Sequence, residues 1–186
     1  MATLNQDPLL RLAGLAGKVD QEFAAIHDRR RACMQCRSGC SDCCRARLSI
    51  TRVEEAFLRR GLAQLPESTL REMAAAARDE TREMCPALDA QGRCRIYDSR
   101  PLICRSYGVP LRHRREVSLV NPPVLDVCDK NFLDIRLKAL PAADVFDQTD
   151  LDATVSKIDA DYCERNGLPA GERVPIAQIL ASGQEP

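Results

Sequence analysis

Apolar residues recur every three or four positions near the start of the chain, at Leu9, Leu12, Leu15, Ala16, Val19, Phe23 and Ile26. This spacing places them on one face of an α-helix and predicts one amphipathic helix over residues 7–31. The helix would lead directly into residues 33–44, where Ser38, Gly39, Ser41 and Asp42 are typical turn formers. We therefore expect a long helix followed by an irregular loop.

Two further helices are predicted in the next part of the chain. Thr51 is followed three residues later by Glu54, which is the pattern of a capping box. It predicts a helix that begins there and runs towards Ala63. Pro66 and Ser68 open a third helix, which we expect to continue through residue 82.

The middle of the chain predicts short, irregular elements. Residues 86–97 resemble a hairpin or knuckle, with Asp89 to Gly92 as its turn. Asp98 is expected to cap a single helical turn over residues 101–105. Residues 108–120 are expected to be extended, and the sequence Asn-Pro-Pro at 121–123 would end that stretch.

The remaining residues predict more helix. We expect one helix over residues 129–140, and another that is capped by Thr149 or Asp150 and ends at Gly167. Residues 175–181 would add a last turn. The sequence thus predicts a mainly α, single domain over residues 1–186, with a cysteine-rich region at about 33–132 and a C-terminal helical extension at about 133–186.

Charge is balanced along the chain, with 27 basic and 27 acidic residues. Such a chain has no overall field that attracts nucleic acid or an anionic membrane, so we expect neither partner. The first residues lack the basic segment of a signal peptide, and no run approaches the roughly 18 apolar residues of a membrane span. We therefore expect a cytoplasmic protein, whose thiols are kept reduced by glutathione and thioredoxin.

Ten cysteines are the strongest chemical signal, and five lie within twelve residues: Cys33, Cys36, Cys40, Cys43 and Cys44. Thiols this dense form disulfides, take part in redox chemistry or bind soft metals. A reducing compartment argues against disulfides. Two CxxC pairs within this stretch are a strong signal for metal, because that spacing lets two sulfurs face one ion. Adjacent Cys43 and Cys44 are hard to direct onto one tetrahedral ion. They would serve two metal atoms, two sites, or one ligand and one neighbouring thiol.

Four later cysteines lie in or beside turn-rich sequence, where a ligand is easily presented: Cys85, Cys94, Cys104 and Cys128. Cys163 lies in a periodic helix and is expected to be a buried core residue. His27 is expected to be a boundary residue of the first helix, and His113 to lie on a solvated strand edge. A phosphate or nucleic-acid contact at His113 is the alternative, although no aromatic residues nearby support it. The sulfur-rich donor set favours an iron–sulfur cluster or a tetrathiolate zinc site.

Arginine supplies 23 of the 27 basic residues, and many arginines lie within three residues of a cysteine: Arg31, Arg37, Arg45, Arg47, Arg93, Arg95 and Arg105. Guanidinium groups there would offset the negative charge of thiolates and donate hydrogen bonds to sulfur. A generally arginine-rich composition is the alternative explanation.

Three spaced elements occur in order: Cys40-x2-Cys43-Cys44-Arg45, then Cys85-Pro-Ala-Leu88 with Gly92-Arg-Cys94-x-Ile-Tyr97, then Arg100-Pro-x-x-Cys104-Arg105-x-Tyr107. Together they resemble the CxxCxxCC (YkgJ-like) cysteine-cluster family over about residues 33–132. The resemblance implies eight metal ligands: Cys36, Cys40, Cys43, Cys44, Cys85, Cys94, Cys104 and Cys128. Because three residues rather than two separate Cys36 from Cys40, Cys33 is an alternative to Cys36. Candidates for side chains beside the metal are Arg45, Arg100, Arg105 and Tyr107. Alternatively, Arg100 begins a helix and Tyr107 belongs to the core.

This family is described as chelating zinc or iron, and it also occurs in the flagellin lysine N-methylase. The resemblance therefore implies a metal-binding protein with an iron–sulfur cluster, preferably [4Fe–4S], or an iron or zinc ion, in electron transfer or an accessory role. We favour the cluster because the ligands are all thiolates and number more than four. A metal chaperone or store, or an accessory domain of a protein lysine methylase, are alternatives.

An enzyme is not favoured by the sequence, and if there is one we expect an oxidoreductase or a methylation-associated activity. The chain lacks a glycine-rich strand-to-helix turn for a nucleotide-like cofactor. The spacing Cys36-x3-Cys40-x2-Cys43 also matches that of radical-SAM enzymes. Those enzymes alternate strands and helices in a barrel, however, and this chain does not.

Overall fold

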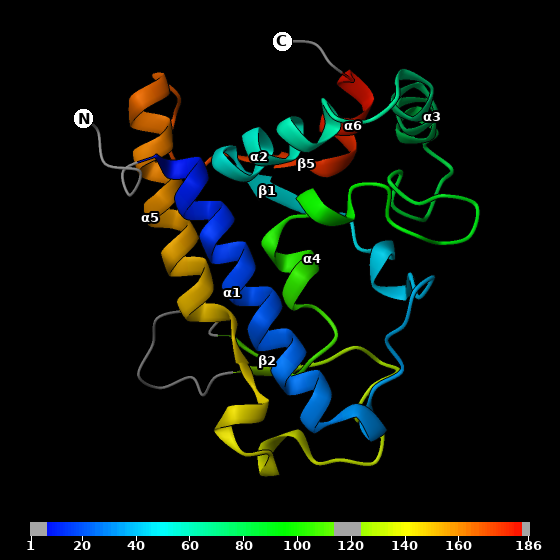
Figure 1. The fold of residues 1–186 in the computed structure, drawn as a ribbon, viewed down its shortest axis with the longest axis vertical. Coiled ribbons are helices and arrows are strands. Elements are labelled where there is room, and N and C mark those ends of the chain that lie inside the picture. The colour runs from blue at the N-terminus through cyan, green and yellow to red at the C-terminus, as the bar shows by residue number, and fades with distance from the viewer. Residues whose placement is uncertain (1–6, 114–123, 184–186) are drawn as a thin grey trace.

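A computed structural model describes residues 7–113 and 124–183 of the chain. Helix α1 (Pro8–Arg29) and helix α5 (Gln148–Asn166) pack side by side, although they come from opposite ends of the sequence (Figure 1). Helix α2 (Arg52–Leu62) contacts both of them, and α3 (Glu67–Arg78) packs against α6 (Ile176–Ser182). Short α4 (Leu102–Ser106) lies against α1. The predicted mainly α class is confirmed.

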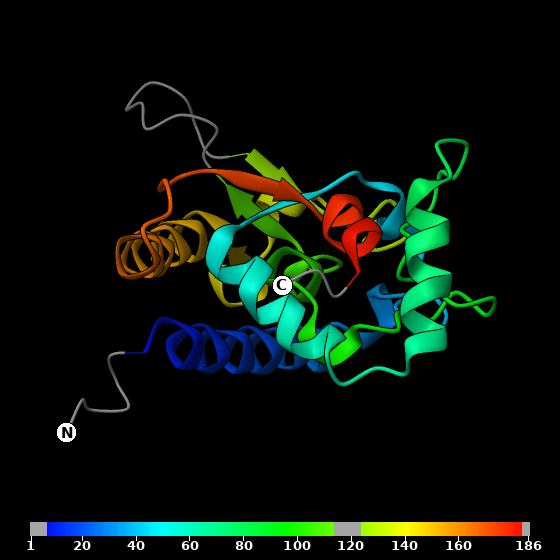
Figure 2. The ribbon, with the colours of Figure 1, turned by 90° about the horizontal axis from the view of Figure 1, so that it is seen from above.

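Two small sheets join distant parts of the chain. Strand β1 (Ser49–Thr51) pairs antiparallel with β5 (Arg173–Pro175), so that Ile50 lies opposite Val174. In the second sheet, β2 (Leu111–His113) lies between β3 (Val124–Asp126), which is antiparallel to it, and β4 (Phe146–Asp147), which is parallel. Seen from above, these strands lie between the helices (Figure 2). Turns of 3₁₀ helix connect the elements, at Arg31–Cys33, Asp42–Arg45, Tyr97–Ser99, Leu137–Ala139 and Ala142–Asp144.

The buried apolar side chains form two clusters. The first lies between α1, α4, α5 and β2, and its centre includes Leu12, Val19 and Ile26 of α1. These are residues of the predicted apolar face, and the helix ends within two residues of the predicted position. The second cluster lies between α2, α3, β1, β5 and α6, and includes Leu58 and Ile179. The segments that carry the cysteines run between these two clusters.

Glu54 links two helices through one buried carboxylate. The predicted capping box is present, because Glu54 Oε2 accepts from the backbone N–H of Thr51 at 3.1 Å. Its other oxygen accepts from the N–H of Leu102 at 3.1 Å, and so caps α4 as well. The prediction that Asp98 caps this turn is wrong. The Asp98 carbonyl instead accepts from the Arg105 guanidinium, and the cap comes from a different helix.

Two predicted helices differ from the structure. Helix α3 ends at Arg78 rather than at residue 82, because the Asp79 carboxylate accepts from the backbone and hydroxyl of Thr81 and turns the chain. Residues 129–140 do not form the predicted helix. Asn131 and Phe132 instead bond to the cysteine-rich segments, and Phe132 adopts a φ of 56°, which an α-helix does not allow.

The C-terminal helices agree with prediction except at one cap. The cap of α5 is Asp147 rather than Thr149 or Asp150, since its carboxylate accepts from the Asp150 N–H at 3.1 Å. Gly167 ends that helix with a φ of 64°, as predicted, and α6 matches the predicted last turn. Of the predicted extended stretch, residues 111–113 form β2, whereas 114–123 lie outside the described residues.

In the part of the chain that the structure describes, no helix has the length and apolarity needed to cross a bilayer.

Substituting Glu54→Gln tests the shared cap. The glutamine amide keeps one acceptor oxygen, but its NH₂ group would face a backbone N–H, so one of the two buried hydrogen bonds would be lost. We expect a loss of about 1–3 kcal/mol in the free energy of unfolding, measured by urea denaturation. The control is Glu67→Gln, which changes an exposed carboxylate in the first turn of α3 and should alter stability by less than about 0.5 kcal/mol. Equal effects at both positions would contradict the role assigned to Glu54.

Candidate metal centre

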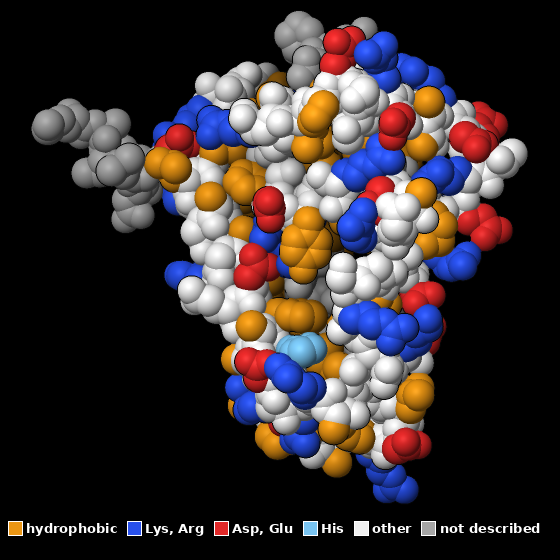
Figure 3. Space-filling view, turned by 45° about the vertical axis from the view of Figure 1, so that its right-hand side comes forward, with side chains coloured by type: hydrophobic (Ala, Val, Ile, Leu, Met, Phe, Trp, Pro, Cys, Tyr) orange, Lys and Arg blue, Asp and Glu red, His pale blue; other side chains and the backbone are white. Residues whose placement is uncertain are grey.

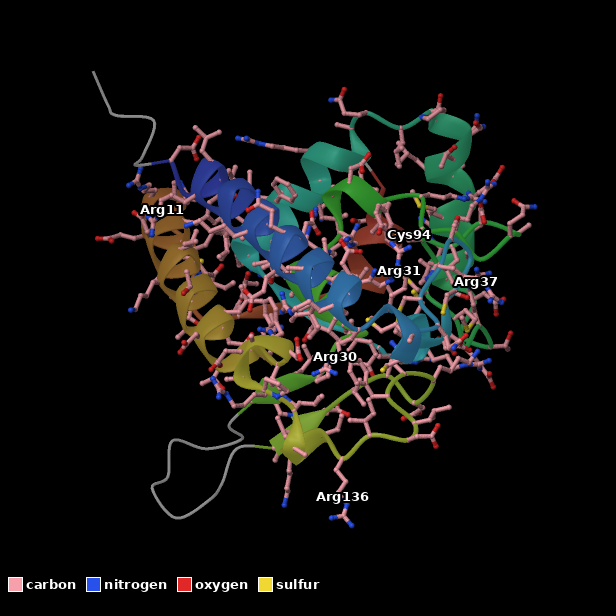
Figure 4. All side chains as sticks on the ribbon, turned by 60° about the horizontal axis from the view of Figure 1, so that its bottom comes forward. Arg11, Arg30, Arg31, Arg37, Cys94 and Arg136 are labelled. Atoms are coloured by element: carbon pink, nitrogen blue, oxygen red, sulfur yellow. The ribbon has the colours of Figure 1, made fainter. Side chains whose placement is uncertain are left out.

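All ten cysteines are free thiols. Sulfur atoms gather on the side of the molecule that carries the labelled Cys94 and Arg37 (Figure 4). Cys163 is separate from them, fully buried within α5, as expected of a core cysteine. On the face in Figure 3, acidic, basic and apolar side chains are intermixed around a shallow hollow.

The loop with Cys36, Cys40, Cys43 and Cys44 packs on the turn before Cys94. A side-chain carbon added to Gly92 would lie 2.9 Å from the Gly39 carbonyl oxygen, and one added to Gly39 would lie 3.2 Å from the Gln91 carbonyl oxygen. Both glycines have positive φ angles, which favour glycine. The two turns therefore pack backbone against backbone at these two glycines, which have no side chains.

The predicted knuckle at residues 86–97 is present as a single antiparallel bridge between Leu88 and Cys94. The Asp89 carboxylate accepts from the backbone N–H groups of Gln91 at 2.9 Å and Arg93 at 2.8 Å, which fixes the turn. The start of the knuckle is held to the cysteine loop, because the N–H of Cys85 donates to the carbonyl of Cys44 at 2.8 Å. Cysteines about 40 residues apart in sequence are thus joined by backbone contacts.

A buried asparagine holds the other cysteine-rich segments together. The Asn131 amide donates to the Gly108 carbonyl at 2.6 Å and to Cys36 Sγ at 3.2 Å, while its oxygen accepts from the N–H of Gln35 at 2.8 Å. Its own N–H donates to the Cys128 carbonyl at 2.8 Å. No pattern in the sequence predicts this role of Asn131, which lies within the residues that were expected to form a helix.

The thiols perturb one another's protonation. The Cys44 thiol donates a hydrogen bond to Cys43, which lowers the pKa of Cys43 to about 7 and raises the pKa of Cys44. Burial raises the pKa of Cys104 to about 12, and the charges of Cys85 and Cys94 add to this. Burial also raises the pKa of Cys94, with Cys85 adding and Arg100 opposing. Such effects require the sulfurs to be near neighbours.

Cys36 has a different set of neighbours. Burial raises its pKa, the hydrogen bond from Asn131 lowers it, and the charges of Cys128, Cys40 and Cys43 raise it further. Cys33, the alternative to Cys36, packs at the edge of the first apolar cluster, and its carbonyl accepts from the N–H of Phe132 at 2.8 Å. These contacts favour Cys36 over Cys33 as the ligand.

The four side chains predicted to flank the metal have different surroundings. Arg100 stacks on the Tyr97 ring at 3.7 Å from its centroid, and its charge opposes the rise that burial causes in the pKa of Cys94. Burial raises the pKa of Tyr107, with Asp126 and then Cys128 adding to the shift. Arg105 is buried and bonds to Asp20 at 2.5 Å, and exposed Arg45 pairs with Glu83 at 3.0 Å. Arg100 and Tyr107 therefore lie within the field of the thiols, whereas Arg105 holds α4 against α1 through Asp20.

Two cations beside the thiols were not singled out from the sequence. Burial raises the pKa of Cys85 and the charge of Arg82 opposes that rise, while Arg82 Nε donates to the carbonyl of Met84 at 3.1 Å. Arg82 lies three residues before Cys85, so it meets the criterion that selected the other arginines, a position within three residues of a cysteine. Lys130 pairs with Asp42 at 2.5 Å, and Cys40 Sγ approaches that carboxylate at 3.7 Å.

His27 lies in the last turn of α1, as expected of a boundary residue. His27 stacks on Phe23 near the end of α1, with ring centroids 6.2 Å apart, and faces Asp28 at 3.5 Å. His113 is half-buried at the end of β2. The prediction of a solvated strand edge for His113 is wrong, because β2 is the central strand of its sheet and His113 Nε2 is buried.

The donor chemistry suits iron or zinc, because the gathered side chains are free thiols with cations close by. Among the described residues, however, no three cysteine, histidine or acidic side chains are already arranged to hold one ion. The cysteine-rich segments already contact one another through their backbones. Metal binding would require their thiol side chains to move closer together.

A family model described as "CxxCxxCC: Putative zinc- or iron-chelating domain" matches residues 35–121. This range contains all of the predicted ligands except Cys128, and it excludes Cys33. Neither the curated proteins nor the solved structures contain a significant match to the chain.

The approach of Gly108 to Cys36 provides a test of the site. A side-chain carbon on Gly108 would lie 3.1 Å from Cys36 Sγ, and its φ of 121° strains any other residue. We expect Gly108→Ala to displace Cys36 and lower the metal bound per chain, measured by elemental analysis. The control is Gly14→Ala in α1, which meets nothing within 4 Å and should keep its metal while gaining up to about 1 kcal/mol of stability. Full metal content in Gly108→Ala would show that this contact does not position a ligand.

Proposed function

Because the chain carries a CxxCxxCC domain over residues 35–121, we propose that it is a metal-binding protein whose thiols hold iron as an iron–sulfur cluster. The proposed ligands are Cys36, Cys40, Cys43, Cys44, Cys85, Cys94, Cys104 and Cys128. One observation carries the choice of iron–sulfur over a single zinc ion. The mutual pKa effects link these all-thiol donors to one another, and eight thiols leave enough ligands for more than one metal atom, whereas a single zinc ion uses four.

The chain's own groups supply what such a cluster requires. Arg82, Arg100 and Lys130 place positive charge near the thiols, which offsets the negative charge of thiolates. The amide of Asn131 donates to Cys36 Sγ, and hydrogen bonds to ligand sulfurs tune a reduction potential. A bound cluster would supply one-electron chemistry, which supports a role in electron transfer or as an accessory subunit.

We propose that the whole chain folds as one unit around this centre. Helix α5 contributes to the first apolar cluster and α6 to the second, so residues 133–186 complete both clusters rather than forming a separate extension. A cytoplasmic location is part of the same proposal, and ten free thiols support it.

Elemental and sulfide analysis tests the proposal. Protein purified without oxygen is expected to be brown, to contain iron and acid-labile sulfide in similar amounts, and to lose visible absorption on reduction. Cys43→Ser and Cys94→Ser should each lower bound iron several-fold, whereas Cys163→Ala should leave it unchanged. A colourless protein that contains stoichiometric zinc would show that the bound metal is zinc and not an iron–sulfur cluster. Equal metal content in all three variants would refute the ligand assignment.

A metal store or chaperone is the second candidate, because Cys43 is exposed. An exposed thiol can pass a metal ion to a partner by ligand exchange. A store should release its metal to an excess of chelator within minutes without unfolding, measured by metal loss and circular dichroism together. A resident redox or structural centre should retain its metal until the chain unfolds. Loss of metal only on unfolding would exclude the store.

A further inference from the structure

The eight proposed ligands do not form one continuous group. Cys85 and Cys94 pack against the second apolar cluster, whereas Cys36 packs against the first. A backbone hydrogen bond joins Cys85 to Cys44, and the Leu88 bridge holds Cys94 beside them. Cys104, on α4, has Cys85 and Cys94 as its strongest charged neighbours. We call these four the knuckle group: Cys44, Cys85, Cys94 and Cys104.

The other four thiols are connected through a different set of contacts, and Cys36 has the other three, Cys128, Cys40 and Cys43, as its charged neighbours. Asn131 donates to Cys36 Sγ and to the Gly108 carbonyl, and its N–H donates to the Cys128 carbonyl. Cys40 approaches Asp42, which pairs with Lys130, two residues after Cys128. We call these four the loop group: Cys36, Cys40, Cys43 and Cys128.

Local geometry explains why the neighbours Cys43 and Cys44 belong to different groups. Both lie in the 3₁₀ turn Asp42–Arg45. A 3₁₀ helix has about three residues per turn, so consecutive side chains point about 120° apart. The carbonyl of Cys44 is bonded to the knuckle, while Cys43 shares the CxxC spacing with Cys40. The Cys44 thiol still bonds to Cys43, and the charge of Cys43 also acts on Cys85, Cys94 and Cys104, so the two groups adjoin at this pair.

Each group also has its own cations. Arg82 acts on Cys85 and Arg100 acts on Cys94, both in the knuckle group. Lys130 lies near Cys40 and Cys128, both in the loop group. Four thiolates around a divalent ion leave a net charge of about −2, so a nearby cation is needed at each centre.

We propose that the chain holds two adjoining metal centres with four thiol ligands each, one formed by the knuckle group and one by the loop group. This inference rests on the proposed function, since it divides the same ligands between two centres. Four thiolates are the usual ligand number of both a structural zinc ion and an iron–sulfur cluster. Two centres with four ligands each therefore use all eight proposed ligand cysteines.

Titration of the full-length, metal-free protein with Co²⁺ tests the division. Co²⁺ bound by four thiolates gives strong sulfur-to-metal charge-transfer bands and visible bands typical of a tetrahedral ion. The wild-type protein should bind two equivalents. Cys94→Ser should lose the four-thiolate spectrum of the knuckle centre and keep that of the loop centre. Cys36→Ser should do the reverse, so each variant retains half of the charge-transfer intensity, and the double variant retains neither.

The matched control is Cys33→Ser, which alters the neighbouring cysteine of the same loop and should bind two equivalents unchanged. Cys104→Ser and Cys40→Ser repeat the test with a second cysteine from each group. Circular dichroism of each variant establishes that it is folded.

The outcomes separate this inference from the proposed function. If the variants of each group retain half of the Co²⁺ charge-transfer intensity, the result supports two centres. Binding of one equivalent by the wild type, or complete loss of the spectrum in every variant, overturns the two centres and leaves a single shared metal site intact. Absence of any Co²⁺ or iron binding by the folded wild type overturns the proposed function itself.

Discussion

The hydrogen bonds of Asn131 are the interaction on which the cysteine-rich half of the fold depends. This side chain is only 2% exposed, and its amide and carbonyl groups both bond to other segments. It joins the loop before Cys36, the turn at Gly108 and the segment after Cys128, none of which has regular secondary structure of its own. An unsatisfied buried amide costs about 1–3 kcal/mol, so each of the three segments is held where it satisfies this group.

Backbone and amide contacts bring the cysteine-rich segments together, and among them only the Asn131 amide also bonds to a sulfur, Cys36 Sγ. The Cys85–Cys44 hydrogen bond, the Gly39–Gly92 contact and the bonds of Asn131 are all made by main-chain or amide groups. The thiols are therefore left free to bind metal. Two apolar clusters on either side supply the stability of the scaffold, because burial of apolar surface does not depend on a bound ion. A chain of this length does not need a metal to form a core.

The sequence predicted the features that depend on local patterns. The face of α1, the capping box at Thr51, the turn at Asp89 and the end of α5 at Gly167 each follow from residues close to one another. The features it missed depend on partners far away in sequence. Glu54 caps a helix 48 residues later, which no local pattern signals.

The helix predicted over residues 129–140 is absent for the same reason, because these residues bond to partners far away in sequence. Their intrinsic preference allowed a helix, but Asn131 and Phe132 gain more from bonding to the segments of Cys36 and Cys33 than from a helix of their own. For the candidate site, the residue types and their order along the chain were predictable. The division of the thiols between two packing environments was not, because it depends on which apolar cluster each segment contacts.

The protonation of the thiols sets a condition for metal binding. Where burial and neighbouring thiols raise a pKa, as at Cys104 and Cys44, the thiol stays protonated at neutral pH. Thiols in that state carry no charge and can lie near one another without repulsion. A metal ion must displace these protons before the sulfurs approach it, so acid opposes binding and each binding event releases protons. A cysteine whose pKa lies near 7, Cys43, is the thiol most readily ionised, and it lies where the two groups meet. The thiolate form is the one that binds metal, and the charge of a bound ion would lower the pKa of the thiols around it in turn.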